Sequence, residues 1–214
     1  MKTVYAIPGL ATTEELFQLT HLSNARLKVL SWPEITSRDT LQSYAKKFLD
    51  QIDTSHPFYL LGVSFGGMLC SEISLLIKPE KTILISSCKC SNELAPMLKL
   101  FRYFPLYSLM NDKMLKRMTK NSRWILGFEK KFMPDFLSMV NSMKPGYIKN
   151  SIHCIVNWKQ HSCHRPDIIH IHGDADKLLT YGSVQSDYTV KGGNHAMIIN
   201  KATEINHLLN QIIV

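Results

Sequence analysis

A serine flanked by glycines is the first group in this sequence that could do chemistry. The stretch Gly62-Val63-Ser64-Phe65-Gly66-Gly67 carries the spacing Gly-x-Ser-x-Gly between two apolar segments, which we expect to be a strand and a helix. A serine on such a sharp turn is held in strained backbone angles with its hydroxyl exposed, and side chains in place of the glycines would collide with neighbouring backbone. The alternative is a glycine-rich turn with an incidental serine. We interpret Ser64 as a nucleophile.

A serine hydroxyl needs a base, and the base needs an acid that orients it. His195 follows Gly192-Gly193-Asn194 on a loop after the last expected strand, from which it could reach the serine; the alternative is an exposed loop histidine. Two acids, Asp174 and Asp176, follow the fifth expected strand. We favour Asp176, because the apolar residues after it continue as if it marked a tight turn. Asp174 remains the alternative acid and could instead brace that turn through its own backbone.

Apolar runs alternate along the chain with segments of helical periodicity. The runs predict strands over residues 4–7, 26–32, 57–62, 81–86, 167–172 and 186–190. Helices are expected over residues 12–19, 38–52, 66–77, 152–158 and 203–213, with apolar residues at three- and four-residue steps in the longer ones. This alternation favours an α/β fold with a parallel sheet covered on both faces. Reactive groups in such sheets gather beyond the carboxyl ends of the strands.

Four stretches together make nearly the whole chain resemble the α/β-hydrolase-fold proteins: Ile7-Pro8-Gly9-Leu10, residues 62–67, residues 172–176 and residues 192–195. The triad order Ser64, Asp176, His195 is the one typical of that fold. The resemblance implies a three-layer α/β/α sandwich of about six mostly parallel strands with a helical lid. It also implies an oxyanion hole made by the backbone N–H groups of Phe65 and Leu10, with no cofactor and no metal.

The chain departs from the family pattern in three places. Pro8-Gly9 stands where the family usually has His-Gly, and Ser31-Trp32-Pro33-Glu34 replaces a common Asp-x-x-Gly stretch. The first two strands of the family fold are missing, which predicts a compact sheet. These departures bear on the substrate class more than on the triad.

The net charge of +8 is concentrated in one segment. Residues 89–150 hold twelve Lys/Arg and four Asp/Glu, so the excess there equals that of the whole chain. We predict a helical, basic lid over residues 89–160, and a hydrolase core made of residues 1–88 and 161–214. One interpretation is a lid whose cations attract an anionic substrate, such as a coenzyme A or carrier-protein thioester, or an acidic surface. We favour the plainer one, an amphipathic cap with a solvated basic exterior, and expect no nucleic acid, since no motif for it is present.

Five cysteines, at positions 70, 88, 90, 154 and 163, are expected to be reduced thiols. The motifs Cys88-Lys89-Cys90 and His161-Ser162-Cys163-His164 suggest zinc, but their gaps are shorter than those of structural zinc sites. No apolar run approaches the roughly 18 residues of a transmembrane segment. Pro8-Gly9 ends the N-terminal apolar stretch too early for a signal peptide, so a cytoplasmic location is expected.

The pattern favours a serine hydrolase acting on a small-molecule carboxylic ester or thioester; the substrate would be anionic under the interpretation in which the lid cations attract it. Two alternatives remain open: a non-hydrolytic enzyme of the same fold, such as a lyase or perhydrolase, and a non-catalytic ligand-binding relative. The acyl length, the leaving group and the oligomeric state do not follow from the residues.

Overall fold

Parallel strands form one sheet in the computed structural model, which describes residues 2–214. Within these residues the strands are β1 (Lys2–Ile7), β2 (Ala25–Val29), β3 (Phe58–Val63), β4 (Lys81–Ile85), β5 (Ile168–Gly173) and β6 (Tyr188–Val190). Their order is β2-β1-β3-β4-β5-β6 and every pair is parallel, as the sequence predicted. Because β1 and β3 are neighbours, with Ile7 beside Gly62, the turns after these two strands lie together.

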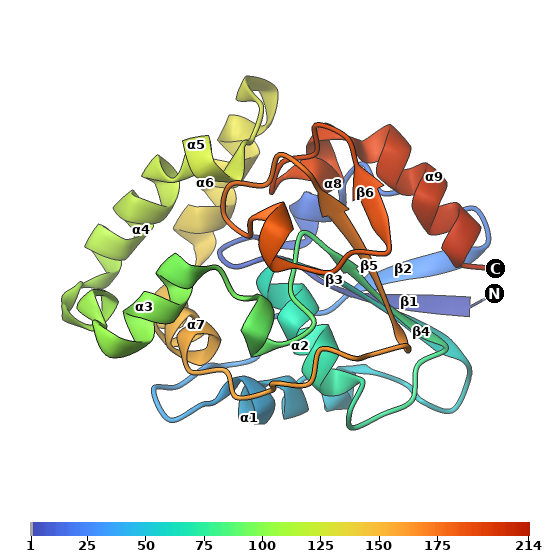
Figure 1. The fold of residues 1–214 in the computed structure, drawn as a ribbon, viewed down its shortest axis with the longest axis horizontal. Helices are drawn as coiled ribbons and strands as arrows, with labels where there is room; N and C mark the ends of the chain where they lie inside the picture. The colour runs from blue at the N-terminus through green and yellow to red at the C-terminus, as the bar shows by residue number, and fades with distance from the viewer. Residues whose placement is uncertain (1) are drawn as a thin grey trace.

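Helices cover both faces of the sheet (Figure 1). On one side lie α1 (Leu41–Lys46) and α2 (Phe65–Ile73), and on the other α8 (Met197–Asn200) and α9 (Ala202–Ile212). Two short 3-10 turns, η1 (Glu14–Phe17) and η2 (Leu49–Gln51), stand where longer helices were predicted. Thr40 caps α1 through the Ser43 N–H, whereas Thr13 makes no such bond to η1. A helix start without its cap loses about 1 kcal/mol, which is consistent with the shorter helix there.

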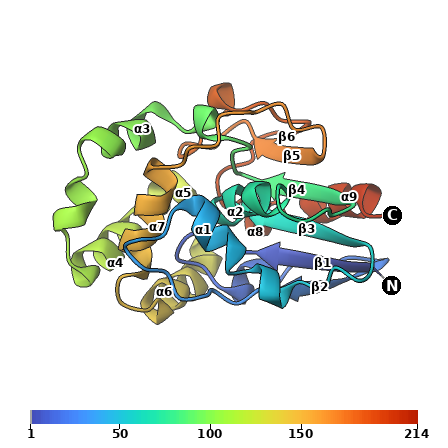
Figure 2. The same cartoon turned by 90° about the horizontal axis from the view of Figure 1, so that it is seen from below.

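The segment between β4 and β5 is helical and stands at the end of the molecule opposite the chain termini (Figure 2). Its elements are η3 (Ser91–Glu93), α3 (Pro96–Tyr103), η4 (Leu106–Leu109), α4 (Asp112–Asn121), α5 (Arg123–Leu126), η5 (Lys130–Phe132), α6 (Met133–Ser142) and α7 (Tyr147–Val156). We call this segment the cap. Its side chains Leu115, Phe136 and Val140 are buried and belong to the same apolar core as the strands, so the cap packs on the sheet domain.

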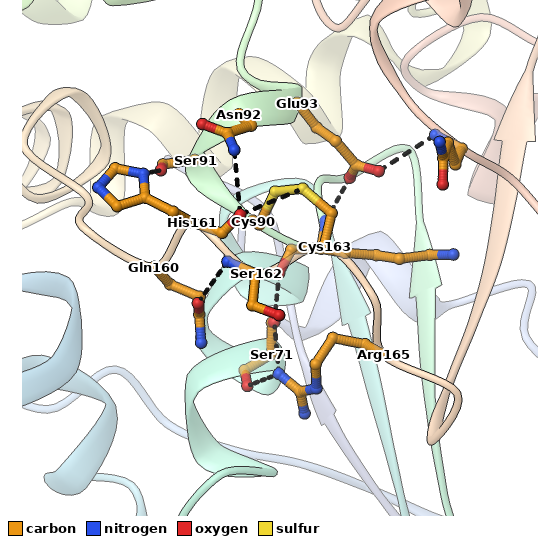
Figure 3. The surroundings of a disulfide bond; sticks show 12 residues. Ser71, Cys90, Ser91, Asn92, Glu93, Gln160, His161, Ser162, Cys163 and Arg165 are labelled. Atoms are coloured by element: carbon orange, nitrogen blue, oxygen red, sulfur yellow. Dashed lines mark hydrogen bonds between the residues drawn. A yellow bond between two sulfur atoms is a disulfide. The ribbon is translucent and has the colours of Figure 1, made fainter.

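The prediction that all five cysteines are reduced is wrong. Cys90 and Cys163 form a disulfide with their Cα atoms 5.1 Å apart (Figure 3). Cys70, Cys88 and Cys154 are free and buried. The two half-cystines lie on the two connections that join the cap to the sheet domain, 73 residues apart in sequence. Hydrogen bonds from the Ser91 N–H to the Gln160 carbonyl (2.7 Å) and from Asn92 to the His161 carbonyl (3.0 Å) join the same connections. Short-range spacing could not indicate this pair, because tertiary folding alone brings the connections together.

The two motifs that suggested zinc thus meet at a disulfide. Within residues 2–214, no group of three or more His, Cys, Asp or Glu side chains could hold a metal ion. In the same part of the chain, no helix combines the length and the apolar character needed to cross a membrane. The cytoplasmic location stays a prediction.

Removing the disulfide should destabilise the protein. Closing a loop of this length lowers the entropy of the unfolded chain enough to contribute about 4 kcal/mol, and measured values are typically about 2–4 kcal/mol. We expect Cys163→Ser to lower the free energy of unfolding, measured by urea denaturation, by about 2–4 kcal/mol. Reduction of the native chain with dithiothreitol should lower it by a similar amount. The variant itself should not respond to dithiothreitol. Equal urea midpoints for the native chain with and without reductant would contradict the pairing.

Candidate active site

Ser64 occupies the turn between β3 and α2 in a backbone conformation that few non-glycine residues adopt, with φ 52° and ψ −119°. The close approach of neighbouring backbone explains the surrounding glycines. A Cβ on Gly62 would overlap the Gly67 backbone, and one on Gly66 would overlap the carbonyls of Ile7 and Pro8 at the end of β1. The turn therefore has the geometry expected from the sequence, with the serine at the N-terminal end of α2.

The structure brings Ser64, His195 and Asp176 into one hydrogen-bonded chain. His195 Nε2 lies 2.9 Å from Ser64 Oγ, and His195 Nδ1 lies 2.8 Å from Asp176 Oδ2. The Asp176 side chain is fully buried, and the imidazole is only 7% exposed. These contacts allow the histidine to take the serine proton from one nitrogen while the aspartate holds the other nitrogen protonated.

Asp176 remains ionised despite its burial. Burial alone would raise the pKa of this carboxyl, but the charge and hydrogen bond of His195 and the backbone N–H groups together hold the pKa below its ordinary value. Its second oxygen accepts the N–H groups of Leu178 and Leu179, both at 2.9 Å. This is the tight turn that the sequence indicated after the aspartate.

Asp174, the alternative acid, lies elsewhere. It is exposed, and its Oδ1 accepts the Gly192 N–H at 2.6 Å. The Ala175 N–H donates to the Gly193 carbonyl at 3.0 Å, so the turn after β5 and the glycine loop after β6 are joined at two points. Asp174 thus braces the loop that carries His195, rather than contacting the imidazole.

Two side chains that the sequence analysis did not assign to the site support the turn that carries Ser64. Ser87, beyond the end of β4, donates from its hydroxyl to the Ser64 carbonyl at 2.6 Å. Trp32, in one of the departures from the family pattern, stacks on Phe65 with ring centroids 5.7 Å apart and donates to the Thr12 carbonyl at 2.9 Å. In the sequence, the only indication of a role for either residue was its polar or aromatic type at the carboxyl end of an expected strand.

The backbone N–H groups of Phe65 and Leu10 flank the nucleophile from two turns. Within residues 2–214, neither group donates to another protein atom. Gly9 and Leu10 line the same cavity as Ser64, and a Cβ on Gly9 would lie 3.5 Å from the Ser64 Cβ. The backbone N–H groups of Phe65 and Leu10 thus have no protein partner among the residues that the structure describes.

An apolar cavity of about 210 Å³ opens above Ser64 and His195, between the sheet domain and the cap. Its lining is dominated by apolar side chains; those from the cap include Leu98, Met118, Ile125, Leu126, Phe128, Phe136, Ile152 and Ile155. The cap is attached directly to the histidine loop. Asn194 donates to the Gly127 carbonyl at 3.0 Å, and the Ala196 N–H donates to the Leu126 carbonyl at 3.0 Å.

Two buried histidines on β5 lie behind the acid. His172 Nε2 donates to the Leu179 carbonyl at 2.7 Å and lies 3.6 Å from Asp176 Oδ2, while His172 Nδ1 lies 3.2 Å from His170 Nε2. Burial lowers the pKa of both rings, that of His170 to about 3. Both rings are therefore neutral, and they support the loop that holds Asp176.

Comparison with known proteins assigns the fold. No model of a known protein family matches the sequence, and no curated protein matches it significantly. Among solved structures, the meta-cleavage product hydrolase CumD from Pseudomonas fluorescens is similar with a TM-score of 0.70 and 14% identity, over 99% of this chain and 90% of that one. A hydrolase from Oleispira antarctica gives 0.70 and 11% over 100% and 91% of the two chains. YbtT, a type II thioesterase of a yersiniabactin pathway, gives 0.65 and 14% over 99% and 91%. The protein therefore has the α/β-hydrolase fold.

The buried His170 should make the protein less stable as the pH falls. The unfolded chain protonates this histidine near its ordinary pKa of 6.5, whereas the folded chain does so only near pH 3. Between these values the unfolded state binds more protons, so the free energy of unfolding decreases with decreasing pH, by about 2 kcal/mol from pH 7.5 to pH 5. Urea denaturation at both pH values measures it. His170→Gln should reduce the decrease in the free energy of unfolding between the two pH values. The control His207→Gln, at an exposed histidine, should leave that decrease unchanged. An equal decrease in both variants would rule out His170 as its source.

Proposed function

We propose that this protein is a serine hydrolase that cleaves a carboxylic ester or thioester through an acyl-enzyme. The observation that carries the proposal is the hydrogen-bonded chain Ser64–His195–Asp176, on a strained turn at the floor of an apolar cavity. The α/β-hydrolase fold is compatible with this activity, but hosts others too. The geometry of the three side chains is therefore the stronger support.

In the acylation step, Ser64 Oγ attacks the carbonyl carbon of the substrate while His195 Nε2 takes the hydroxyl proton. Asp176 keeps the Nδ1 proton of His195 in place and stabilises the imidazolium that forms. The N–H groups of Phe65 and Leu10 donate to the oxyanion; the loss of one such donor typically costs about 10²–10³ in rate. The intermediate then collapses, and His195 returns the proton to the departing alcohol or thiol.

Deacylation repeats the same steps with water. His195 takes a proton from the water, the hydroxide adds to the acyl carbon, and Ser64 Oγ leaves with the proton that His195 returns. The products are a carboxylic acid and free Ser64, so the proton balance closes without a metal or cofactor.

The cavity supports an apolar acyl group as the part of the substrate next to Ser64. Apart from His195, no titratable side chain lines the cavity among the residues that the structure describes. An anionic part of a substrate, such as that of a thioester carrier, would therefore lie outside the cavity. One structural neighbour is a type II thioesterase and others are hydrolases, so neither leaving group is favoured by the fold.

Covalent labelling tests the nucleophile and its acid together. A fluorophosphonate should add once to the native chain, as measured by intact mass, and not at all to Ser64→Ala. Asp176→Asn should slow labelling strongly, by up to about 10⁴, because the imidazole loses its orientation. The matched control Asp174→Asn should slow it less than about tenfold. Labelling of Ser64→Ala at the native rate would refute the assignment, and no label on the folded native chain would favour a ligand-binding protein.

The cavity predicts a preference for longer acyl chains. In a series of p-nitrophenyl esters, kcat/KM should rise by up to about fourfold per added methylene until the cavity is filled, since each buried methylene contributes about 0.8 kcal/mol. Ile152→Phe, which enlarges a side chain of the cavity wall, should shift the optimum to shorter chains. Ile212→Phe on α9 is the control and should leave the optimum unchanged. Highest activity on the acetate, with no effect of Ile152→Phe, would exclude this cavity as the acyl site.

A further inference from the structure

The outer side of the cap exposes an unusual concentration of large apolar side chains. Within residues 2–214, most exposed large hydrophobic residues lie between positions 97 and 125. They are Met97, Leu100, Tyr103, Phe104, Leu106, Leu109, Met114, Met118, Trp124 and Ile125. Leu109 is 84% exposed and Trp124 77% exposed. Exposed apolar groups gathered in this way indicate an interaction surface rather than an ordinary solvated exterior.

These residues belong to consecutive elements. All but Phe104, which directly follows α3, lie on α3, η4, α4 and α5, which run along the outer side of the cap, at the end of the molecule away from both termini (Figures 1 and 2). In α3, Met97 and Leu100 are three residues apart and share one side of the helix, while Leu98 and Phe101 pack against the core. The exposed apolar side chains thus extend the cap surface without being needed for its packing.

Cations accompany the apolar side chains. In α4, Lys113, Arg117 and Lys120 share the side opposite the buried Leu115, and in the part of the chain that the structure describes none of the three pairs with a carboxylate. Lys116 differs, because its ammonium donates to the carbonyls of Asn141 and Met143 within the cap. Arg123 lies 5.3 Å from the Trp124 ring. Unpaired cations beside exposed aromatic and leucine side chains are the pattern of segments that bind anionic membrane surfaces.

The same surface reaches the cavity above Ser64. Met118 and Ile125 both line that cavity and are 44% and 42% exposed, so part of its wall belongs to the outer side of the cap. The outer side of the cap and the cavity wall therefore share these two side chains. A second copy of this chain is a poorer fit, because two such faces would bring like charges together.

We propose that the outer face of the cap, residues 96–125, binds the surface of an anionic lipid bilayer. Leu109 and Trp124 enter the headgroup region, and Lys113, Arg117 and Lys120 contact lipid phosphates. Peripheral binding of this kind needs no spanning helix. It does not depend on the proposed hydrolase activity, so Ser64→Ala should bind vesicles as the native chain does.

Vesicle flotation with the full chain tests the proposal. The native protein should float with phosphatidylcholine vesicles that contain about 30% phosphatidylserine, and much less with phosphatidylcholine alone or in 0.5 M salt. The apolar pair Leu109→Ser/Trp124→Ser should raise the lipid concentration at half binding about tenfold or more. The charge set Lys113→Gln/Arg117→Gln/Lys120→Gln should have a similar effect, since each cation near the surface contributes several-fold in affinity.

Matched controls distinguish binding by the cap face from non-specific binding by exposed side chains elsewhere. Leu75→Ser/Tyr188→Ser removes exposed apolar side chains elsewhere, and Arg38→Gln/Lys46→Gln/Lys78→Gln removes the same charge from the sheet domain. Both controls should bind like the native chain, and circular dichroism checks that every variant is folded. Native protein that does not float, or control variants that lose as much binding as the cap variants, would overturn the proposal. Failure to bind vesicles together with binding to poly-glutamate would also overturn it, because that result assigns the cap face to an acidic protein. Failure to bind vesicles together with dimerisation through Trp124 would overturn it too, because that result assigns the face to a second copy.

Discussion

The strained backbone of Ser64 is the constraint on which the rest of the site depends. A positive φ at a serine persists only where the surrounding structure enforces it. Here the enforcement comes from close contact of three chain segments, since Gly62 and Gly66 let α2 approach β3 and the end of β1. Ser87 holds the Ser64 carbonyl from the end of β4. The sheet order β1-β3-β4 therefore brings the supports of the turn from both neighbouring strands.

His195 and Asp176 reach Ser64 from strands that are not neighbours of β3 in the sheet. β5 and β6 lie two and three strands from β3, so His195 approaches Ser64 only because its loop turns back over the sheet. That loop has two supports: the acid turn after β5 through Asp174 and Ala175, and the cap through Asn194. The cap therefore helps to position the imidazole of His195, and it also forms part of the cavity wall.

The cap combines two surfaces with different chemistry. Its inner side is apolar and forms much of the cavity wall, while its outer side mixes cations with exposed aromatic and leucine side chains. The Cys90–Cys163 disulfide joins the two connections of this segment to the sheet domain. It links the two ends of the cap where they leave the sheet domain. Trp32, which stands in one of the stretches that depart from the α/β-hydrolase pattern, contacts Phe65 and Thr12 beside Ser64.

Local sequence determined the strands and the turn that carries Ser64, because each depends on periodicity or spacing within a few residues. The apolar run before Ser64 and the glycines around it predict both the strand and the turn. Tertiary structure decided what depends on distant segments: Asp176 rather than Asp174 beside His195, the support from Ser87 and Trp32, and the pairing of Cys90 with Cys163. These contacts join residues far apart in the chain, and no local pattern specifies which distant side chain will be the partner.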